Sequence, residues 1–398
     1  MEDIYNREKW YKSELKRVRK ANISDRNKEI IIKFHNHLYS ESASDPRVVK
    51  LSCQLRKLAI WLEKDFDKTT EEDIRKVVAE INKSTYSEAT KSDYKRIIKQ
   101  FYKWFEGKGK TIPEKVEWIK CRVKTNGKDN MDIITPSEVK KVIEQCENTR
   151  DKAFLSLLYE GGFRIAEILN MKIRDFENST NYGKARVTGK TGPRKILVVS
   201  SVAYINQHLS THPFRENPDS FLWLSIGTYN HNQRLNYIGS RGIIKRAFKR
   251  AEVKKKRLYP HLFRHSRATE LASHLTEAQM KKYFGWEQGS DMASVYVHMS
   301  GRDVDNGILN YYGLIKEKDD NKDKLGNNIN CQRCNTVNPS ESKYCTTCGL
   351  ALNIKVAMES EALVKEETNK TFELLIEMMN DPKIMKEFND FKENHLQK

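Results

Sequence analysis

The chain has 398 residues, of which 38% are hydrophobic and 32% are charged. Its formal net charge is +18 at pH 7, and its sequence pI is about 9.4. No apolar run approaches the roughly 20 residues that a membrane-spanning helix needs, and residues 1–10 lack the apolar core of a secretory signal. These features exclude a membrane protein and predict a cytoplasmic location. The positive charge favours a polyanionic partner, although an ordinary basic surface explains it almost as well.

The first hundred residues have the apolar periodicity of helices. Leucines recur at spacings of three and four over residues 51–62, and a second stripe over residues 74–81 has a capping signal in Thr70 and Asp73. A third helix is predicted over residues 87–105. One of its faces carries a stripe of four lysines, namely Lys91, Lys95, Lys99 and Lys103. Such a stripe is either a solvated helix face or a set of phosphate contacts.

A basic segment over residues 111–130 predicts a linker between two domains. Apolar side chains alternate there with basic ones, as in an extended segment with one basic side, and the basic residues are Lys120, Arg122 and Lys124. Thr135 and Glu138 then form a capping-box signal around Pro136, which marks the start of a new helix. We therefore expect the second domain to begin near residue 131.

The second domain is predicted to be mostly helical with one hairpin. Two β-rich runs, residues 184–188 and 195–199, flank a glycine-containing turn that carries Lys190. Helices are expected to dominate from there to about Tyr312, and residues 317–329 have the charged, polar composition of a flexible tether.

Four short motifs in this domain carry charged and aromatic residues that are far apart in the sequence. Arg164 lies in GGFRIAE, Lys190 in TGKTG, His261 and Arg264 in HLFRH, and Tyr296 in SVYVH, shortly after Trp286. In this order and at these separations the motifs resemble the active site of the tyrosine recombinases, the phage-integrase family of DNA strand-exchange enzymes. The resemblance covers roughly residues 25–316, is specific from Thr135 onward, and is closest to the archaeal branch.

The resemblance implies a catalytic role for each of these residues. Arg164 and Arg264 would neutralise the charge that grows on the non-bridging oxygens of the phosphorane-like transition state. Tyr296 would attack phosphorus, and its phenol should lose its proton more readily beside the two cations. Lys190 would protonate the leaving 5′-oxygen. His261 and Trp286 would complete the catalytic set, with an indole N–H that can donate to a phosphate oxygen.

Simpler interpretations exist for several of these residues. Arg164 and Glu167 could form an ordinary surface ion pair, or Glu167 could brace the guanidinium from the same helix face. Trp286 could be a core tryptophan, because most family members have a histidine at this point and the gap to Tyr296 is one residue longer than in the commonest bacterial members. His265 matches a histidine to which the family gives a structural part.

The cysteines divide into three isolated residues and one quartet. The quartet has the spacing C-x2-C-x10-C-x2-C and consists of Cys331, Cys334, Cys345 and Cys348. Two such pairs resemble a zinc ribbon, in which all four thiolates bind one structural metal ion. An iron centre on the same ligands and four free thiols are the alternatives. Without an export signal, a disulfide framework is not expected.

The predicted fold class is a mainly α chain with a small β-sheet (α+β). In chain order we expect a helical core-binding (SAM-like) DNA-binding domain (1–110), a basic linker (111–130), a tyrosine recombinase catalytic domain (131–316), a tether (317–329), a zinc-ribbon-like module (330–353) and a helical tail (354–398). The tail contains two amphipathic helices that break at Asp381 and Pro382. They could pack on the zinc module or exchange between subunits.

The implied function is site-specific DNA recombination through a 3′-phosphotyrosyl intermediate, without a catalytic cofactor. The expected partners are double-stranded DNA target sites, further copies of the chain in a homo-tetramer on paired sites, and an accessory protein that sets direction; no membrane is involved. Two alternatives share the fold: a type IB topoisomerase, which rejoins the original strand, and a DNA-binding regulator that has lost catalysis.

Overall fold

The computed structural model describes residues 3–5, 7–107, 109–121, 132–179, 182–189, 191–228, 230–255, 257–299, 312, 328–380 and 382–395. The chain forms two compact units, Glu2–Met131 and Asp132–Lys398. We describe each unit by itself. Together they are mainly helical with small antiparallel sheets, as the sequence predicts.

The N-terminal unit is built from helices around one apolar core. Its elements are α1 (Arg7–Lys20), α2 (Asp25–Ser40), α3 (Asp45–Leu62), the 3-10 turn η1 (Phe66–Lys68), α4 (Glu71–Lys83), α5 (Glu88–Phe105) and α6 (Glu114–Glu117). Side-chain oxygens of Ser24, Thr70 and Ser87 accept backbone N–H hydrogen bonds and start three of these helices. Aromatic and aliphatic side chains from α2, α3 and α5, among them Phe34, Leu55 and Phe101, fill the core.

Residues 113–121 pack on this core instead of forming an extended linker. Val116 and Ile119 are buried in it, because a short helix turns their apolar side chains inward. The carbonyl oxygens of Glu117 and Ile119 accept hydrogen bonds from Lys99 Nζ at 2.9 and 3.3 Å. The predicted basic residues Arg122 and Lys124 lie outside the described residues.

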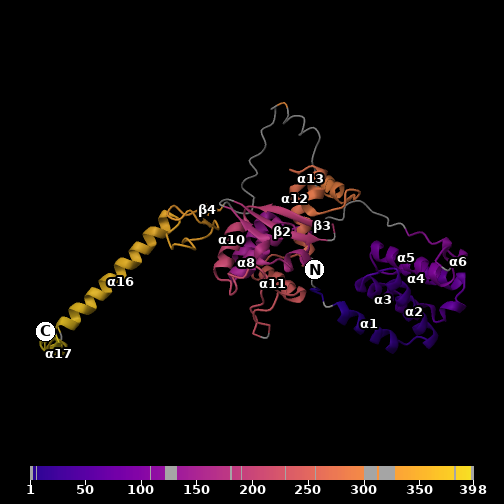
Figure 1. The fold of residues 1–398 in the computed structure, drawn as a ribbon, viewed down its shortest axis with the longest axis horizontal. Helices are drawn as coiled ribbons and strands as arrows, with labels where there is room; N and C mark the ends of the chain where they lie inside the picture. Colours follow the sequence, from indigo (N-terminus) through magenta and orange to yellow (C-terminus); the bar gives the residue numbers. More distant parts are fainter. Residues whose placement is uncertain are drawn as a thin grey trace. The chain divides into compact units, whose positions relative to one another are not determined.

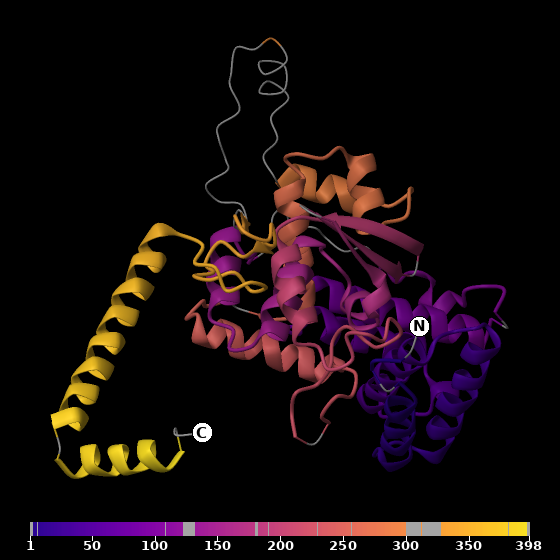
Figure 2. The same ribbon diagram turned by 60° about the vertical axis from the view of Figure 1, so that its left-hand side comes forward.

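The C-terminal unit contains a small antiparallel sheet among helices. The part that resembles a catalytic domain comprises α7 (Pro136–Glu144), α8 (Thr149–Glu160), α9 (Ile165–Leu169), η2 (Ile173–Asp175), β1 (Phe176–Asn178), β2 (Gly183–Gly189), β3 (Gly192–Val198), α10 (Ser201–Ser210), α11 (Tyr237–Arg250), α12 (Pro260–Leu271), α13 (Glu277–Phe284) and α14 (Met292–Met299). The strand order is β1-β2-β3. Strands β2 and β3 form a twisted ribbon beside the helices (Figures 1 and 2).

Helix α8 is the centre of this unit. Most of its side chains are buried, and it contacts α7, α10 and α12. Its last residue, Glu160, is itself buried and accepts backbone N–H bonds from Val199 and Ser201, both at 2.7 Å, which fixes the start of α10. Between α10 and α11 the prediction of dominant helix is wrong. Residues 211–236 form turns and isolated bridges, in which Leu222 and Trp223 are buried through backbone pairing rather than helical periodicity.

The last part of the chain consists of a cysteine-containing segment and a helical tail. Two short strands, β4 (Ile329–Asn330) and β5 (Val337–Asn338), are followed by α16 (Ile354–Asn380) and α17 (Pro382–His395) (Figure 1). The segment contacts α10, where Tyr204 Oη donates to Glu341 Oε1 at 2.7 Å. Tyr344 also bonds to Ser360 at 2.7 Å, which ties the segment to the first part of α16.

The break between the two tail helices is as predicted, but most of their apolar side chains are exposed. In α16 the structure buries Val356 and exposes Phe372 and Leu375. Packing on the cysteine segment therefore involves only the start of the tail. Among the described residues, none of the helices combines the length and the hydrophobicity that a membrane span requires.

Candidate active site

Arg264 is the most deeply placed cation of the predicted site. Pro260 begins α12, and Arg264 follows one turn later with only 4% of its surface exposed. Its Nη1 donates to the Gly162 carbonyl oxygen at 2.8 Å and its Nη2 to the Phe284 carbonyl oxygen at 2.6 Å. Burial, followed by the positive charge of Arg164, lowers the pKa of Arg264 to about 9. The guanidinium therefore joins the ends of α8 and α13 to α12.

Arg164 lies beside it and is braced by a buried carboxylate. Its Nη1 donates to Glu167 Oε1 at 2.9 Å and its Nη2 to the Gly285 carbonyl oxygen at 3.0 Å. The Glu167 side chain is only 1% exposed, whereas that of Arg164 is 29% exposed. The surface ion-pair interpretation is therefore excluded, because Glu167 lies beneath the arginine and away from water.

The β2–β3 hairpin reaches the same place. Gly189 ends β2 so close to Glu167 that an added Cβ would meet Oε1 at 2.4 Å, so any larger residue there would displace the carboxylate. Thr191 Oγ1 donates to the Gly285 carbonyl oxygen at 3.1 Å. Lys190, which the sequence places between these two residues, lies outside the described residues.

Tyr296 on α14 is buried against the side chains of Trp286 and His265. The Trp286 indole stacks on the phenol ring with centroids 5.5 Å apart and an interplanar angle of 1°. The Tyr296 hydroxyl donates a hydrogen bond to His265 Nδ1. His265 has a ring centroid 6.2 Å from that of His261, which is exposed at the surface of α12. The structure thus brings Arg164, His261, Arg264, Trp286 and Tyr296 to one end of α12.

The direction of the Tyr296 pKa is opposite to the sequence expectation. Burial of the phenol raises its pKa to about 12, and the positive charge of Arg264 offsets only part of this rise. The hydroxyl is therefore protonated at neutral pH and can donate to His265. Burial also lowers the pKa of His265 to about 4, with smaller contributions from His261 and Arg264, so its imidazole is neutral and accepts that bond.

His261 has a pKa shifted in the same direction. Partial desolvation lowers the pKa of His261, and the charges of Arg264 and Arg164 lower it further. All three groups lie near the N-terminal end of α12, where unpaired backbone N–H groups favour an anion. A phosphate bound at this end would offset the positive charges of Arg164 and Arg264.

One site residue was not found from the sequence. Arg194 on β3 donates from Nη1 and Nη2 to the two carboxylate oxygens of Glu167 at 2.8 and 2.7 Å. A signal for it exists in the strand alternation, because Arg194 has the same parity as the buried residues Ile196 and Val198. The parity of β3 therefore predicts an inward-facing arginine, which is unusual unless it has a partner.

The lysine stripe of α5 lies in the N-terminal unit and is only partly free for phosphate. Lys99 is held by the two backbone carbonyls described above, and Lys91 pairs with Glu88 at 3.0 Å. Lys95 and Lys103 are half-buried along the same helix, and Lys120 is exposed. The interpretation as a solvated face and that as a phosphate surface both remain compatible with these positions.

The cysteine quartet converges as its spacing predicts. One sulfur atom from each of Cys331, Cys334, Cys345 and Cys348 lies within 4.8 Å of the other three. The pairs Cys331–Cys348 and Cys334–Cys345 have Sγ atoms 3.5 Å apart, and none of the four is in a disulfide. This arrangement of four sulfurs around one point fits a tetrahedral metal ion.

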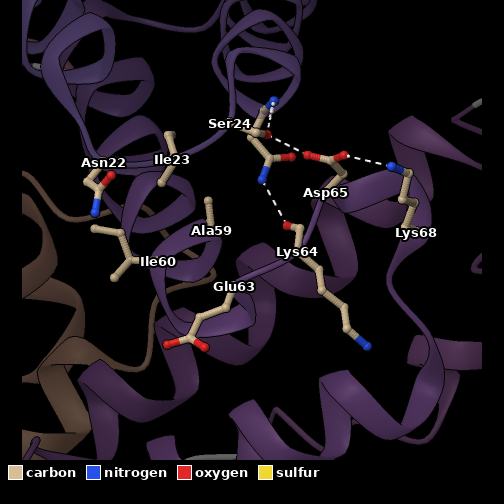
Figure 3. A pocket seen from close by; sticks show the side chains of 10 residues that line it. Asn22, Ile23, Ser24, Ala59, Ile60, Glu63, Lys64, Asp65 and Lys68 are labelled. Carbon is tan, nitrogen blue, oxygen red and sulfur yellow. Dashed lines mark hydrogen bonds and ion pairs between the residues drawn. The ribbon is translucent and has the colours of Figure 1, made fainter.

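A cavity of about 760 Å³ lies between the end of α1 and the end of α3. Figure 3 shows that its polar groups bind one another: Ser24 Oγ donates to Asp65 at 2.5 Å, and Lys68 pairs with Asp65 at 3.3 Å. These bonds satisfy polar groups at the ends of helices. We assign no chemistry to this cavity.

The comparisons with known proteins agree with the geometry. Residues 132–302 match the model of the phage integrase family. Transposase A from transposon Tn554 of Staphylococcus aureus is 26% identical over 206 residues, which cover 48% of this chain and 55% of that protein. Tyrosine recombinase XerA of Pyrococcus horikoshii is 29% identical over 140 residues, 35% of this chain and 46% of that protein. This chain thus spans about half the length of these curated relatives.

A solved structure shares the fold at low sequence identity. The site-specific recombinase XerH, bound to a palindromic difH substrate, has a TM-score of 0.54 at 14% identity, over 78% of this chain and 97% of that chain. This likeness shows the fold alone. Together the family match and the curated relatives define a phage integrase domain over residues 132–302. This domain of the chain belongs to the phage integrase family and is similar to the tyrosine recombinases.

Proposed function

We propose that this protein is a site-specific DNA recombinase whose nucleophile is Tyr296. The observation that carries the proposal is the joint placement of Arg164, Arg264 and Tyr296 by segments that are far apart in the sequence, at the N-terminal end of α12. A protein that retained only the fold would have no need to keep two arginines in a site where one is almost fully buried.

The proposed reaction begins with phosphate binding. A guanidinium offers five N–H donors, more than the two that Arg264 gives to backbone carbonyls, so one side chain can hold its place and bind phosphate. Arg164, the more exposed of the two, would contact the second non-bridging oxygen. Both would stabilise the charge that grows on these oxygens as the phosphorane-like transition state forms.

Attack by the Tyr296 oxygen forms the bond to phosphorus and breaks the bond from phosphorus to the 5′-oxygen. The phenolic proton passes to His265 Nδ1, which already accepts the hydrogen bond and whose lowered pKa would rise when the negative phosphate enters the site. Lys190 supplies a proton to the departing 5′-oxygen. Trp286 holds the phenol ring by stacking, and His261 adds a phosphate contact at the surface. A 5′-hydroxyl then attacks the phosphotyrosine and returns the tyrosine oxygen, so no catalytic cofactor is required.

The experiment that tests this function traps the covalent intermediate. A synthetic target with a nick near the scissile phosphate loses a short fragment after cleavage, so the protein stays attached to DNA in a denaturing gel. We expect an adduct through the 3′-phosphate. A plasmid with two target sites then separates the classes: recombinant products support a recombinase, relaxation alone indicates a topoisomerase, and binding without any adduct indicates an inert regulator.

We also propose that the cysteine quartet holds one structural zinc ion. Four thiolates would complete its coordination sphere and leave no position for a substrate, so the ion would stabilise the segment and take no part in cleavage. The bond between Tyr204 and Glu341 would then fix this zinc-ribbon-like module on α10.

The proposed partners follow from the function. Double-stranded DNA would bind to the catalytic unit and to basic residues of the N-terminal unit, including Lys95, Lys103 and Lys120, and two target sites would assemble a homo-tetramer. An accessory protein would set direction, and the protein would act in the cytoplasm. XerH, whose structure holds its difH substrate, supports the DNA partner. A DNA affinity that does not fall with rising salt would contradict the phosphate contacts.

A further inference from the structure

Arg194 occupies an unusual position for a charged residue of a small sheet. It lies on β3 opposite Val187 of β2, and its side chain is only 10% exposed. Its neighbours Arg186 and Lys195 have the opposite parity, and both pair with the exposed carboxylate of Glu177. Strand geometry thus separates one inward arginine from two outward cations on the same hairpin.

The contacts of Arg194 connect three parts of the active site. Its two terminal nitrogens bind both oxygens of Glu167, and its Nε donates to the Tyr283 carbonyl oxygen at 3.2 Å. It also packs so close to Gly285 that an added Cβ there would meet Nη1 at 2.9 Å. Gly285 has a φ of +61° and ends α13 directly before Trp286, so Arg194 fixes the hairpin against the loop that carries the indole.

The charge of Glu167 gives this contact its consequence. Burial tends to raise the pKa of the Glu167 carboxyl, but the hydrogen bonds and charge of Arg194, followed by those of Arg164, hold that pKa below its usual value. A buried carboxylate needs a cation. The Arg164 guanidinium supplies one bond to Glu167 and the Arg164 backbone N–H a second, whereas the Arg194 guanidinium alone supplies two in the bidentate geometry that guanidinium groups favour.

We propose that Arg194 is a positioning residue that serves as the counter-ion of Glu167 and so leaves the charge of Arg164 available for the scissile phosphate. Without Arg194, the buried carboxylate would have Arg164 as its nearest cation and would draw that guanidinium down, away from the phosphate. The net charge of the group formed by Glu167 and its three neighbouring arginines would then fall by one positive unit. This inference rests on the proposed function, because it assumes that Arg164 acts on phosphate.

The test uses the full-length protein and the nicked target, with single-turnover adduct formation and DNA affinity measured separately. We expect Arg194→Ala to lower the rate of adduct formation by about 100-fold, the loss associated with one misplaced transition-state donor, while DNA affinity stays within a few fold. Arg194→Lys keeps the charge without the fork and should recover part of the rate. The matched control is Arg186→Ala, which removes an outward arginine from the adjacent strand and should leave the rate unchanged.

A second variant separates positioning from simple structural support. In the Arg194→Ala background, Glu167→Gln removes the negative charge that captures Arg164, so the double variant should cleave about tenfold faster than Arg194→Ala alone. A merely structural role predicts that the double variant is no faster, since both anchors of the hairpin are then lost. Because the double variant lacks the unpaired buried carboxylate and folds more readily than Arg194→Ala, both rates are taken per mole of folded protein, measured by circular dichroism.

The measurements distinguish failure of the Arg194 positioning role from failure of the proposed function. If wild type forms no adduct on its cognate site, the recombinase function itself is wrong. If wild type forms the adduct and Arg194→Ala does so at the rate of Arg186→Ala, only the positioning role is wrong. A double variant that cleaves no faster than Arg194→Ala also overturns it.

Discussion

The candidate active site and the cysteine quartet are two polar sites in one unit, and they are built in opposite ways. The cysteines lie between residues 331 and 348, and their sulfurs converge through short local turns. The active-site residues lie between 164 and 296 and meet only because α8, the hairpin, α12, α13 and α14 pack together. A site within one short segment depends on spacing, whereas a site of scattered residues depends on the whole domain.

The two sites also satisfy their polar groups differently. Arg264 and Arg164 repel each other, and backbone carbonyls at the ends of α8 and α13 together with Glu167 hold them in place. The cysteine sulfurs instead face one another around a common point. The active site is therefore held together by the protein's own hydrogen bonds and is positive enough for phosphate, whereas the cysteine site, under the zinc proposal, would depend on a metal ion for its stability.

The largest effect that we expect comes from Tyr296→Phe, which removes one oxygen and almost no volume. Adduct formation should disappear, while DNA affinity and secondary structure persist, because the ring still stacks on Trp286. The stability loss should be about 1 kcal/mol, for the bond to His265. The matched control is Tyr283→Phe, which loses a hydroxyl bond to the Glu160 carbonyl and should retain the adduct. An adduct that persists in Tyr296→Phe would show that the nucleophile is misassigned.

Replacing the two arginines separately should distinguish chemistry from support. Arg164→Ala and Arg264→Ala should each lower the cleavage rate by about 10² to 10³. Only Arg264→Ala should also destabilise the domain, by about 1–3 kcal/mol, because it leaves the buried carbonyls of Gly162 and Phe284 without their donor. Single-turnover kinetics and chemical denaturation measure the two effects. Arg174→Ala, at an exposed ion pair, serves as the control. Equal stability losses for Arg164 and Arg264 would contradict the assigned anchor.

Disrupting the cysteine site should have the opposite effect, with a large loss of local stability and a small loss of cleavage rate. Replacing Cys334 and Cys345 together with serine should remove the bound metal, measured by elemental analysis, and make residues 328–353 sensitive to protease. Cleavage of the nicked target should fall by less than about tenfold, far less than after loss of one transition-state donor. Cys121→Ser, outside the quartet, should change neither metal content nor protection. Freshly purified wild type without metal would refute the zinc proposal.

The smallest effect concerns pH. The His265 pKa is lowered from 6.5 to about 4, so the folded protein favours the neutral imidazole and the unfolded chain binds the proton first. The stability that His265 contributes is present above pH 6.5 and is lost as pH falls toward 4. We expect the difference in unfolding free energy between wild type and His265→Asn to shrink over that range. The other buried histidines titrate in both proteins, so their contributions cancel in this difference in unfolding free energy. A difference that grows in acid would contradict the neutral His265.

Local rules in the sequence predicted the secondary structure around the site. The capping box at Thr135 and the hairpin strands lie where spacing and residue type place them. The convergence of the four cysteines followed in the same way from two short spacings. Such features depend on residues a few positions apart, whose geometry the backbone nearly determines.

The tertiary structure alone decided the rest. It buried Val116 and Ile119 against the N-terminal core, formed turns over residues 211–236, and directed Arg194 at Glu167. It also reversed the expected shift of the Tyr296 pKa, because the sequence places cations near the phenol but does not reveal how far burial removes it from water. Desolvation depends on every neighbour that packing brings, and those neighbours come from segments that sequence spacing does not relate.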